Sequence, residues 1–161
     1  MEFWEKFRFD ARGCMMSNVK QPSGYTIFCD DIREEIGGKI SLIGVYQYKK
    51  ISSATFPVVI PKLCILVNYQ PVRANYQGDM IINIFLPGDD EGRPTVTQVV
   101  EKPNLDMIEE RVNFIPHIMA SFAFSPLVIE TSGCIRVFIE CEKIKTDMGA
   151  IYVSSTKSAE L

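Results

Sequence analysis

The chain has 161 residues, of which 47% are apolar and 23% charged, and this composition suits one globular domain with a core large enough to be stable alone. A formal net charge of -3 argues against a nucleic-acid-binding protein, because such proteins carry a basic face. The five cysteines lack Cys-x-x-Cys spacing, so they fit neither a disulfide framework nor a zinc site. We therefore expect reduced thiols, a cytoplasmic location and no cofactor.

Residues 1–24 differ from the rest of the chain and are expected to form an N-terminal extension. Phe3 and Phe7 have helical spacing, so this segment is either a short amphipathic helix or disordered. Its basic and acidic residues balance, which disfavours a membrane anchor. No uncharged run reaches the roughly 18–20 apolar residues of a transmembrane helix. We expect one domain over 25–155, a polar tail over 156–161 and no contact with a membrane.

From residue 25 onward, apolar strand patterns alternate with turns rich in glycine and proline. The predicted strands cover residues 25–32, 39–50, 63–69, 79–86, 95–101, 117–124 with a continuation at 127–129 after Ser125-Pro126, 134–142 and 150–153. Seven or eight short strands at spacings of about 10 residues are typical of an all-β, two-sheet antiparallel sandwich, immunoglobulin-like or C2-like. The lack of alternating helices argues against a parallel α/β fold.

The sequences of four segments indicate where each of them lies in the fold. Residues 63–69 are apolar on both faces, which predicts a central strand, whereas the alternating residues 95–101 predict an edge strand. The prolines of residues 56–61 suit an edge or a crossover. Residues 104–113 show helical spacing and are either one short helix or a long connection.

A resemblance to a known family rests on several of these segments. The most specific is the run Cys29-Asp-Asp-Ile-Arg-Glu-Glu-Ile-Gly-Gly-Lys39, followed by Phe56-Pro-Val-Val-Ile-Pro-Lys-Leu63. Ser125-Pro-Leu127 and Gly149-Ala-Ile-Tyr152 also match. Over residues 25 to about 155, the chain resembles an uncharacterised family of bacterial and phage-associated proteins. That resemblance implies a small β-rich domain of unknown function, and it supplies no catalytic residues.

The charged hairpin within that run is the strongest candidate for a binding site. It carries Asp30, Asp31, Arg33, Glu34 and Glu35. Adjacent residues of a strand point to opposite faces, so Asp30 and Asp31 are poorly placed to share a metal ion. Salt bridges and turn solvation are the favoured interpretation, and an inward-pointing aspartate must be paired because an isolated buried carboxylate is costly.

Three further sequence features bear on the hairpin turn, on metal binding and on catalysis. The pair Gly37–Gly38 is expected to supply positive φ angles in the hairpin turn. Asp89, Asp90 and Glu91 form an acidic loop that resembles a calcium loop only in composition, and it is a weak metal alternative. The sole histidine, His117, is expected to be a partly buried structural residue, because no nucleophile motif accompanies it.

Together these patterns predict a non-enzymatic interaction or structural module that binds a protein partner or associates with itself. The charged hairpin and the predicted edge strand are the candidate contact regions. Tyrosines suit a surface patch that binds protein, and the candidates are Tyr46, Tyr48, Tyr69 and Tyr76. The alternative is a sandwich that binds a carbohydrate or calcium through its acidic loops.

Overall fold

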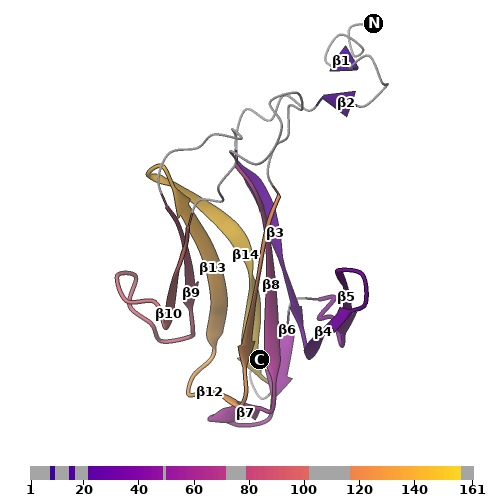
Figure 1. Cartoon of the computed structure of the whole chain (residues 1–161). Helices are drawn as coiled ribbons and strands as arrows, with labels where there is room; N and C mark the ends of the chain where they lie inside the picture. Colours follow the sequence, from indigo (N-terminus) through magenta and orange to yellow (C-terminus); the bar gives the residue numbers. More distant parts are fainter. Residues whose placement is uncertain are drawn as a thin grey trace, which may run out of the picture.

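The computed structural model describes residues 8–9, 15–16, 22–48, 50–71, 79–101 and 117–156 (Figure 1). These residues form β-strands joined by turns and contain no α-helix, so the predicted all-β class is confirmed. None of the described segments forms a helix that is long and apolar enough to cross a membrane. The helix considered near Phe3 and the helix considered within residues 104–113 both lie outside the described residues.

The larger sheet has five strands in the order β10-β9-β13-β14-β6. Their bounds are β10 Val96–Val100, β9 Met80–Phe85, β13 Gly133–Cys141, β14 Ile144–Ser155 and β6 Lys50–Ser53. Neighbouring strands are antiparallel except β14 and β6, which are parallel. The predicted edge strand is confirmed, because β10 ends the sheet within the described part of the chain.

The second sheet has three strands in the order β11-β8-β3. Their bounds are β11 Ile118–Phe124, β8 Leu63–Gln70 and β3 Ser23–Cys29. Both neighbours pair with β8 in an antiparallel register. All seven residues from Leu63 to Tyr69 are buried, so the prediction of a central strand is confirmed.

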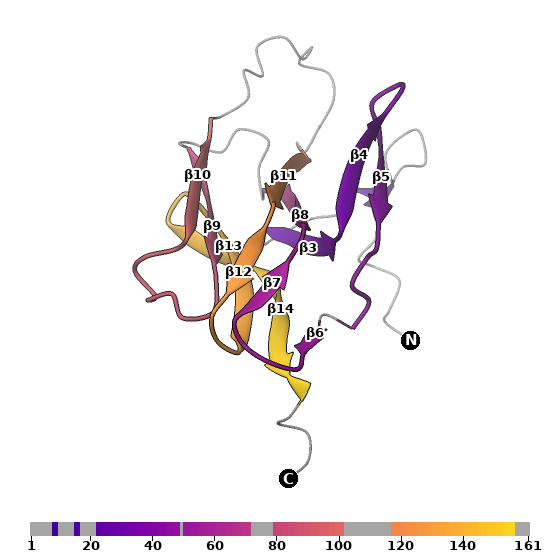
Figure 2. The same cartoon turned by 90° about the horizontal axis from the view of Figure 1, so that it is seen from below.

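The two larger sheets lie side by side and share one hydrophobic core (Figures 1 and 2). Alternate residues of each strand point inward, as the period of two of a β-strand requires. The core members of the central strands are Leu63, Ile65, Val67, Tyr69, Met80, Ile82, Ile84, Ile135, Val137, Ile139, Ile151 and Val153. Burial of these side chains joins strands that are distant in sequence and holds the two layers together.

Two-stranded sheets account for strands beyond the seven or eight expected. β7 (Val58–Ile60) pairs with β12 (Leu127–Ile129), and β4 (Asp31–Glu35) pairs with β5 (Lys39–Ile43). The short pieces β1 (Arg8–Phe9) and β2 (Met15–Met16) form a further pair.

A backbone turn makes one strand shorter than the sequence pattern predicts. The predicted strand over residues 39–50 ends at Ile43, because Gly44 adopts a φ of 67° and turns the chain. The interruption predicted at Ser125-Pro126 is confirmed, since it separates β11 from β12 and proline cannot donate a ladder hydrogen bond.

Candidate functional site

The β4–β5 hairpin, residues 31–43, projects from the side of the domain, and we call it the β4–β5 arm (Figure 1). Its turn contains Gly37 and Gly38 with φ angles of 84° and 71°. The prediction that these two glycines supply positive φ is therefore confirmed. With no Cβ to clash, glycine adopts this conformation without the strain that other residues suffer.

The register of the arm separates a mainly polar face from a mainly apolar one. Directly paired residues share a face. The mainly polar face carries Asp31, Arg33, Glu35, Lys39, Ser41 and Ile43, and the other face carries Ile32, Glu34, Ile40 and Leu42. No side chain of residues 31–43 is fully buried, although the structure describes all of them, and Ile36 at the tip is 99% exposed. The arm therefore contributes no fully buried side chain to the domain core.

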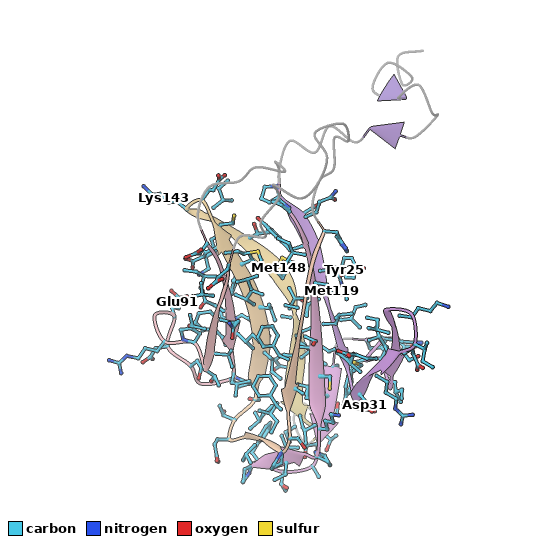
Figure 3. The ribbon with its side chains drawn as sticks, viewed as in Figure 1. Tyr25, Asp31, Glu91, Met119, Lys143 and Met148 are labelled. Carbon is cyan, nitrogen blue, oxygen red and sulfur yellow. The ribbon has the colours of Figure 1, made fainter. Side chains whose placement is uncertain are left out.

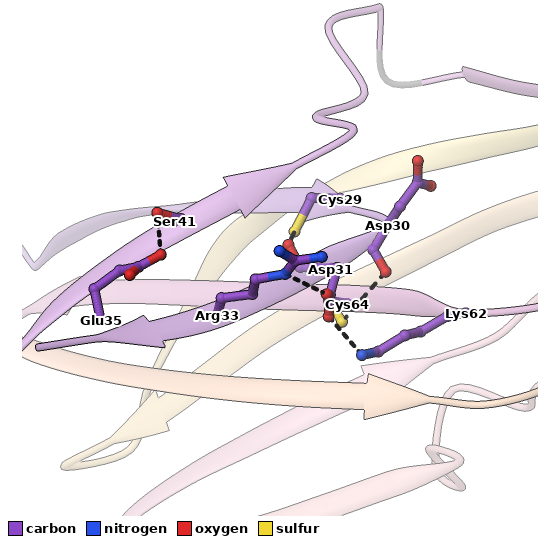
Figure 4. Close-up of polar contacts among 8 residues, drawn as sticks. All are labelled: Cys29, Asp30, Asp31, Arg33, Glu35, Ser41, Lys62 and Cys64. Carbon is purple, nitrogen blue, oxygen red and sulfur yellow. Dashed lines mark hydrogen bonds and ion pairs between the residues drawn. The ribbon is translucent and has the colours of Figure 1, made fainter.

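The base of the arm is held by an ion pair that joins it to the start of β8. Lys62 Nζ donates to Asp31 Oδ1 at 2.5 Å, and Arg33 Nε donates to Asp31 Oδ2 at 3.3 Å (Figure 4). The hydrogen bond from Lys62, followed by that from Arg33, lowers the pKa of Asp31. The same contact raises the pKa of Lys62. Both groups are thus kept charged at neutral pH.

Asp30 fixes the opposite side of the base. The Tyr46 hydroxyl donates to Asp30 Oδ1 at 2.9 Å. Burial, followed by this hydrogen bond to a carboxylate, raises the pKa of Tyr46 to about 12. The backbone N–H of Asp30 donates to the carbonyl of Ile43 at 2.9 Å, and the N–H of Tyr46 donates to the carbonyl of Phe28 at 3.0 Å.

The carboxylates predicted as a cluster are thus divided among separate partners. Asp30 and Asp31 point in different directions (Figure 4). Glu35 Oε1 accepts a hydrogen bond from Ser41 Oγ at 2.9 Å, while Glu34 is exposed on the other face. Among the described residues, no group of three or more histidine, cysteine, aspartate or glutamate side chains could hold a metal ion. The arrangement is one of structural pairing with an exposed charged surface.

The tyrosines do not form one patch. Tyr48 is 91% exposed just after β5, but Tyr46 is half-buried against Asp30. The prediction that Tyr69 contributes to the surface is wrong, since it points into the core from β8 and is 2% exposed. Burial also raises the pKa of Tyr69 to about 12. Tyr76 lies outside the described residues.

Exposed aliphatic side chains are the feature that the sequence reading missed. Ile36, Ile43 and Val45 are all exposed on or beside the arm. The signal available in the sequence was an isoleucine inside a turn, next to Gly37–Gly38, where no core can reach it.

The acidic loop between β9 and β10 uses its first carboxylate as an internal support. Asp89 Oδ2 accepts from the backbone N–H of Leu86 at 2.9 Å, and from the N–H and Oγ1 of Thr95, each at 2.8 Å. Partial burial opposes ionisation of Asp89, but these hydrogen bonds prevail and lower its pKa. The N–H of Arg93 donates to the backbone carbonyl of Asp90 at 2.9 Å, and Glu91 lies in the loop beyond it (Figure 3).

His117 precedes β11 and is exposed, so the expectation of partial burial is wrong for this residue. It comes directly before the strand and its side chain therefore falls outside the inward row that begins at Ile118.

Comparison with known proteins places the chain in a family. The model of the family of unknown function DUF6941 matches residues 24–154, so the chain belongs to that family. No curated protein matches the chain. No solved structure matches it either.

Proposed function

We propose that this domain is a non-enzymatic interaction module that presents the β4–β5 arm to a protein partner. The observation that carries the proposal is the contrast between the base and the tip of the arm. The base is fixed by Asp31–Lys62 and Asp30–Tyr46, whereas the tip exposes Ile36 almost completely. Apolar groups that gather on an exposed element are typical of interaction sites.

The base contacts matter because an isolated two-stranded hairpin is only marginally stable in water. Contacts that order the arm before binding reduce the conformational entropy lost when a partner binds. Lys62 joins the arm to β8, the central strand of its sheet, so the arm is anchored to the best-buried part of the domain.

The chemistry of the arm favours a protein surface as the ligand. Ile36 and Tyr48 offer apolar and aromatic contact area, and both are exposed. The arm carries charges of both signs, Arg33 and Lys39 beside Glu34 and Glu35. Mixed charges around apolar residues suit a protein interface, because polyanions and anionic membranes require a mainly basic surface.

The finer fold class and the location belong to the same proposal. We infer a sandwich, immunoglobulin-like or C2-like, which the shared core of the two larger sheets supports. The free thiols of Cys29, Cys64 and Cys141 are buried, which supports a reducing compartment such as the cytoplasm. The bacterial and phage association stays a prediction from the sequence.

The calcium and carbohydrate alternative has less support. The carboxylates of Asp30, Asp31 and Asp89 already accept hydrogen bonds from protein donors. A calcium-dependent rise in Tm that Asp89→Ala abolishes would establish the calcium form of this alternative.

The test compares two surface variants in capture from host lysate with quantitative mass spectrometry. Ile36→Asp alters the tip of the arm, and Val59→Asp alters an exposed residue of β7 that lies outside the arm. Neither side chain is buried, so both variants should melt within about 1 °C of the wild type. We expect a protein that the wild type and Val59→Asp retain equally and Ile36→Asp loses. Equal retention by all three proteins would refute the role of the arm.

A further inference from the structure

The outer edge of the three-stranded sheet is formed by β11. Within the described residues, β11 pairs with β8 alone, in an unbroken register from Ile118↔Tyr69 to Phe124↔Leu63. Its second side therefore carries backbone N–H and C=O groups with no strand opposite them in the described structure. Such a row is a template for pairing with another strand.

β11 lacks the features by which proteins usually protect an edge. Its sequence, Ile-Met-Ala-Ser-Phe-Ala-Phe, contains no charge and no proline, and its pairing contains no bulge. Of the other uncharged edges, β10 is shorter, and its Val99 carbonyl already accepts a hydrogen bond from Gln98 Nε2 at 2.8 Å. β3 is as long as β11, but it lies beside β14, whose Met148 side chain packs at Gly24. β11 is thus the long uncharged edge best suited to pair with another strand.

The residues of β11 are complementary to a second copy of the same strand. An antiparallel copy centred on Ser121 places Ala120 opposite Phe122, so a small side chain faces a large one. The same register places Met119 opposite Ala123 on the other face. Every facing pair is uncharged. By contrast, β4 paired with itself about Arg33 would set Asp31 opposite Glu35, and like charges facing each other are destabilising.

Pairing would also cover apolar surface that one molecule leaves partly exposed. Ile118, Phe122 and Phe124 pack against the core yet remain only partly buried. Met119 is 53% exposed on the outer face, in the same cross-strand row as Tyr25 (Figure 3). A second strand beside β11 would cover these groups and so add a hydrophobic contribution to the backbone hydrogen bonds.

We infer that two copies of this chain associate by antiparallel pairing of β11 with β11 about Ser121, which makes one sheet continuous through a twofold dimer. The inference rests on the proposed function, because both treat the domain as an interaction module. It uses a different surface, however, so the β4–β5 arm stays free in the dimer.

The test combines light scattering with site-directed disulfides. Wild type should elute with twice the chain mass of 18.2 kDa. In a background with Cys14 and Cys134 changed to serine, Ser121→Cys should form a covalent dimer on mild oxidation. Met119→Cys or Ala123→Cys alone should not, but an equimolar mixture of the two should, because these residues face each other across the interface. All three positions are exposed on the outer face, so the substitutions leave the core intact.

Two further variants separate this inference from the proposed function. Ser121→Lys places two lysines together at the twofold axis and should halve the measured mass, whereas Ile36→Asp should leave it unchanged. A monomeric wild type overturns the dimer but leaves binding of a protein partner by the arm open to its own test. The assignment to β11 is overturned if Ile36→Asp disrupts the dimer while Ser121→Lys leaves it intact. It is also overturned if Thr97→Cys in β10 cross-links the dimer and Ser121→Cys does not.

Discussion

Gly44 leaves open the space that the Asp30 carboxylate occupies. A Cβ atom on Gly44 would overlap the carboxyl group of Asp30, and Gly44 has a φ of 67°. The same carboxylate accepts the hydrogen bond from Tyr46. One glycine after β5 therefore permits the contact that fixes the base of the arm.

Gly44→Ala should destabilise the domain by about 2–3 kcal/mol. A left-handed backbone costs alanine about 1–2 kcal/mol, and displacement of Asp30 removes a hydrogen bond worth about 1 kcal/mol. Urea unfolding followed by circular dichroism measures the change. Gly37→Ala is the matched control, because Gly37 has a φ of 84° and no neighbouring atom within 4 Å. This variant should lose only the stability that the left-handed backbone costs alanine. Equal losses in the two variants would show that the contact with Asp30 contributes nothing.

Local signals made much of the fold predictable. The Gly37–Gly38 turn, the doubly apolar β8 and the alternating β10 were all readable, because turn chemistry and burial on one or both faces act within a few residues. The charged hairpin was likewise identified as a structural unit with paired carboxylates.

Long-range pairing set the limits of prediction. Lys62 is 31 residues from Asp31, so no local pattern indicates their ion pair. Tyr69 and Tyr48 look alike in sequence, yet only the partners of β8 decide that Tyr69 is buried. The parallel pairing of β6 with the end of β14 joins residues about a hundred positions apart, and nothing in either segment specifies it.

Asp31 should make the domain sensitive to acid. Its folded pKa lies below 3.8, the value for the free side chain, because Lys62 and Arg33 favour the ionised form. The folded state therefore binds fewer protons than the unfolded state in this range. The stabilisation is complete above pH 3.8 and is lost as the pH falls through the folded pKa.

Asp31→Asn should consequently show a smaller fall in Tm than the wild type as the pH drops below that range, measured by calorimetry at several pH values. Lys62→Met tests the same pair from its other member and should flatten the profile in the same direction. Profiles parallel to the wild type in both variants would contradict the role of this ion pair.

Asp89→Ala should cost about 2 kcal/mol, because one carboxylate oxygen accepts all three loop hydrogen bonds and its removal leaves their donors to water. Asp90→Ala, one residue along, should change stability by no more than about 0.5 kcal/mol. Urea denaturation of the two variants measures the difference. If Asp90→Ala is the more damaging change, then Asp89 is not the support of this loop.

Lys143→Gly should stabilise the domain. The turn between β13 and β14 consists of Glu142 and Lys143, which have φ angles of 52° and 67°, and it lies at one end of the larger sheet (Figure 3). Two-residue hairpin turns of this kind favour asparagine and glycine, since other residues are strained at positive φ. The strain energy relieved in the folded state exceeds the free-energy cost of glycine's greater entropy in the unfolded chain. The free energy of unfolding should therefore rise by about 0.5–1 kcal/mol. Differential scanning fluorimetry should show a rise in Tm of about 1–4 °C. Lys143→Ala removes the same charge but keeps the Cβ atom, so it should give no rise, and a rise of equal size in both variants would assign the effect to the charge.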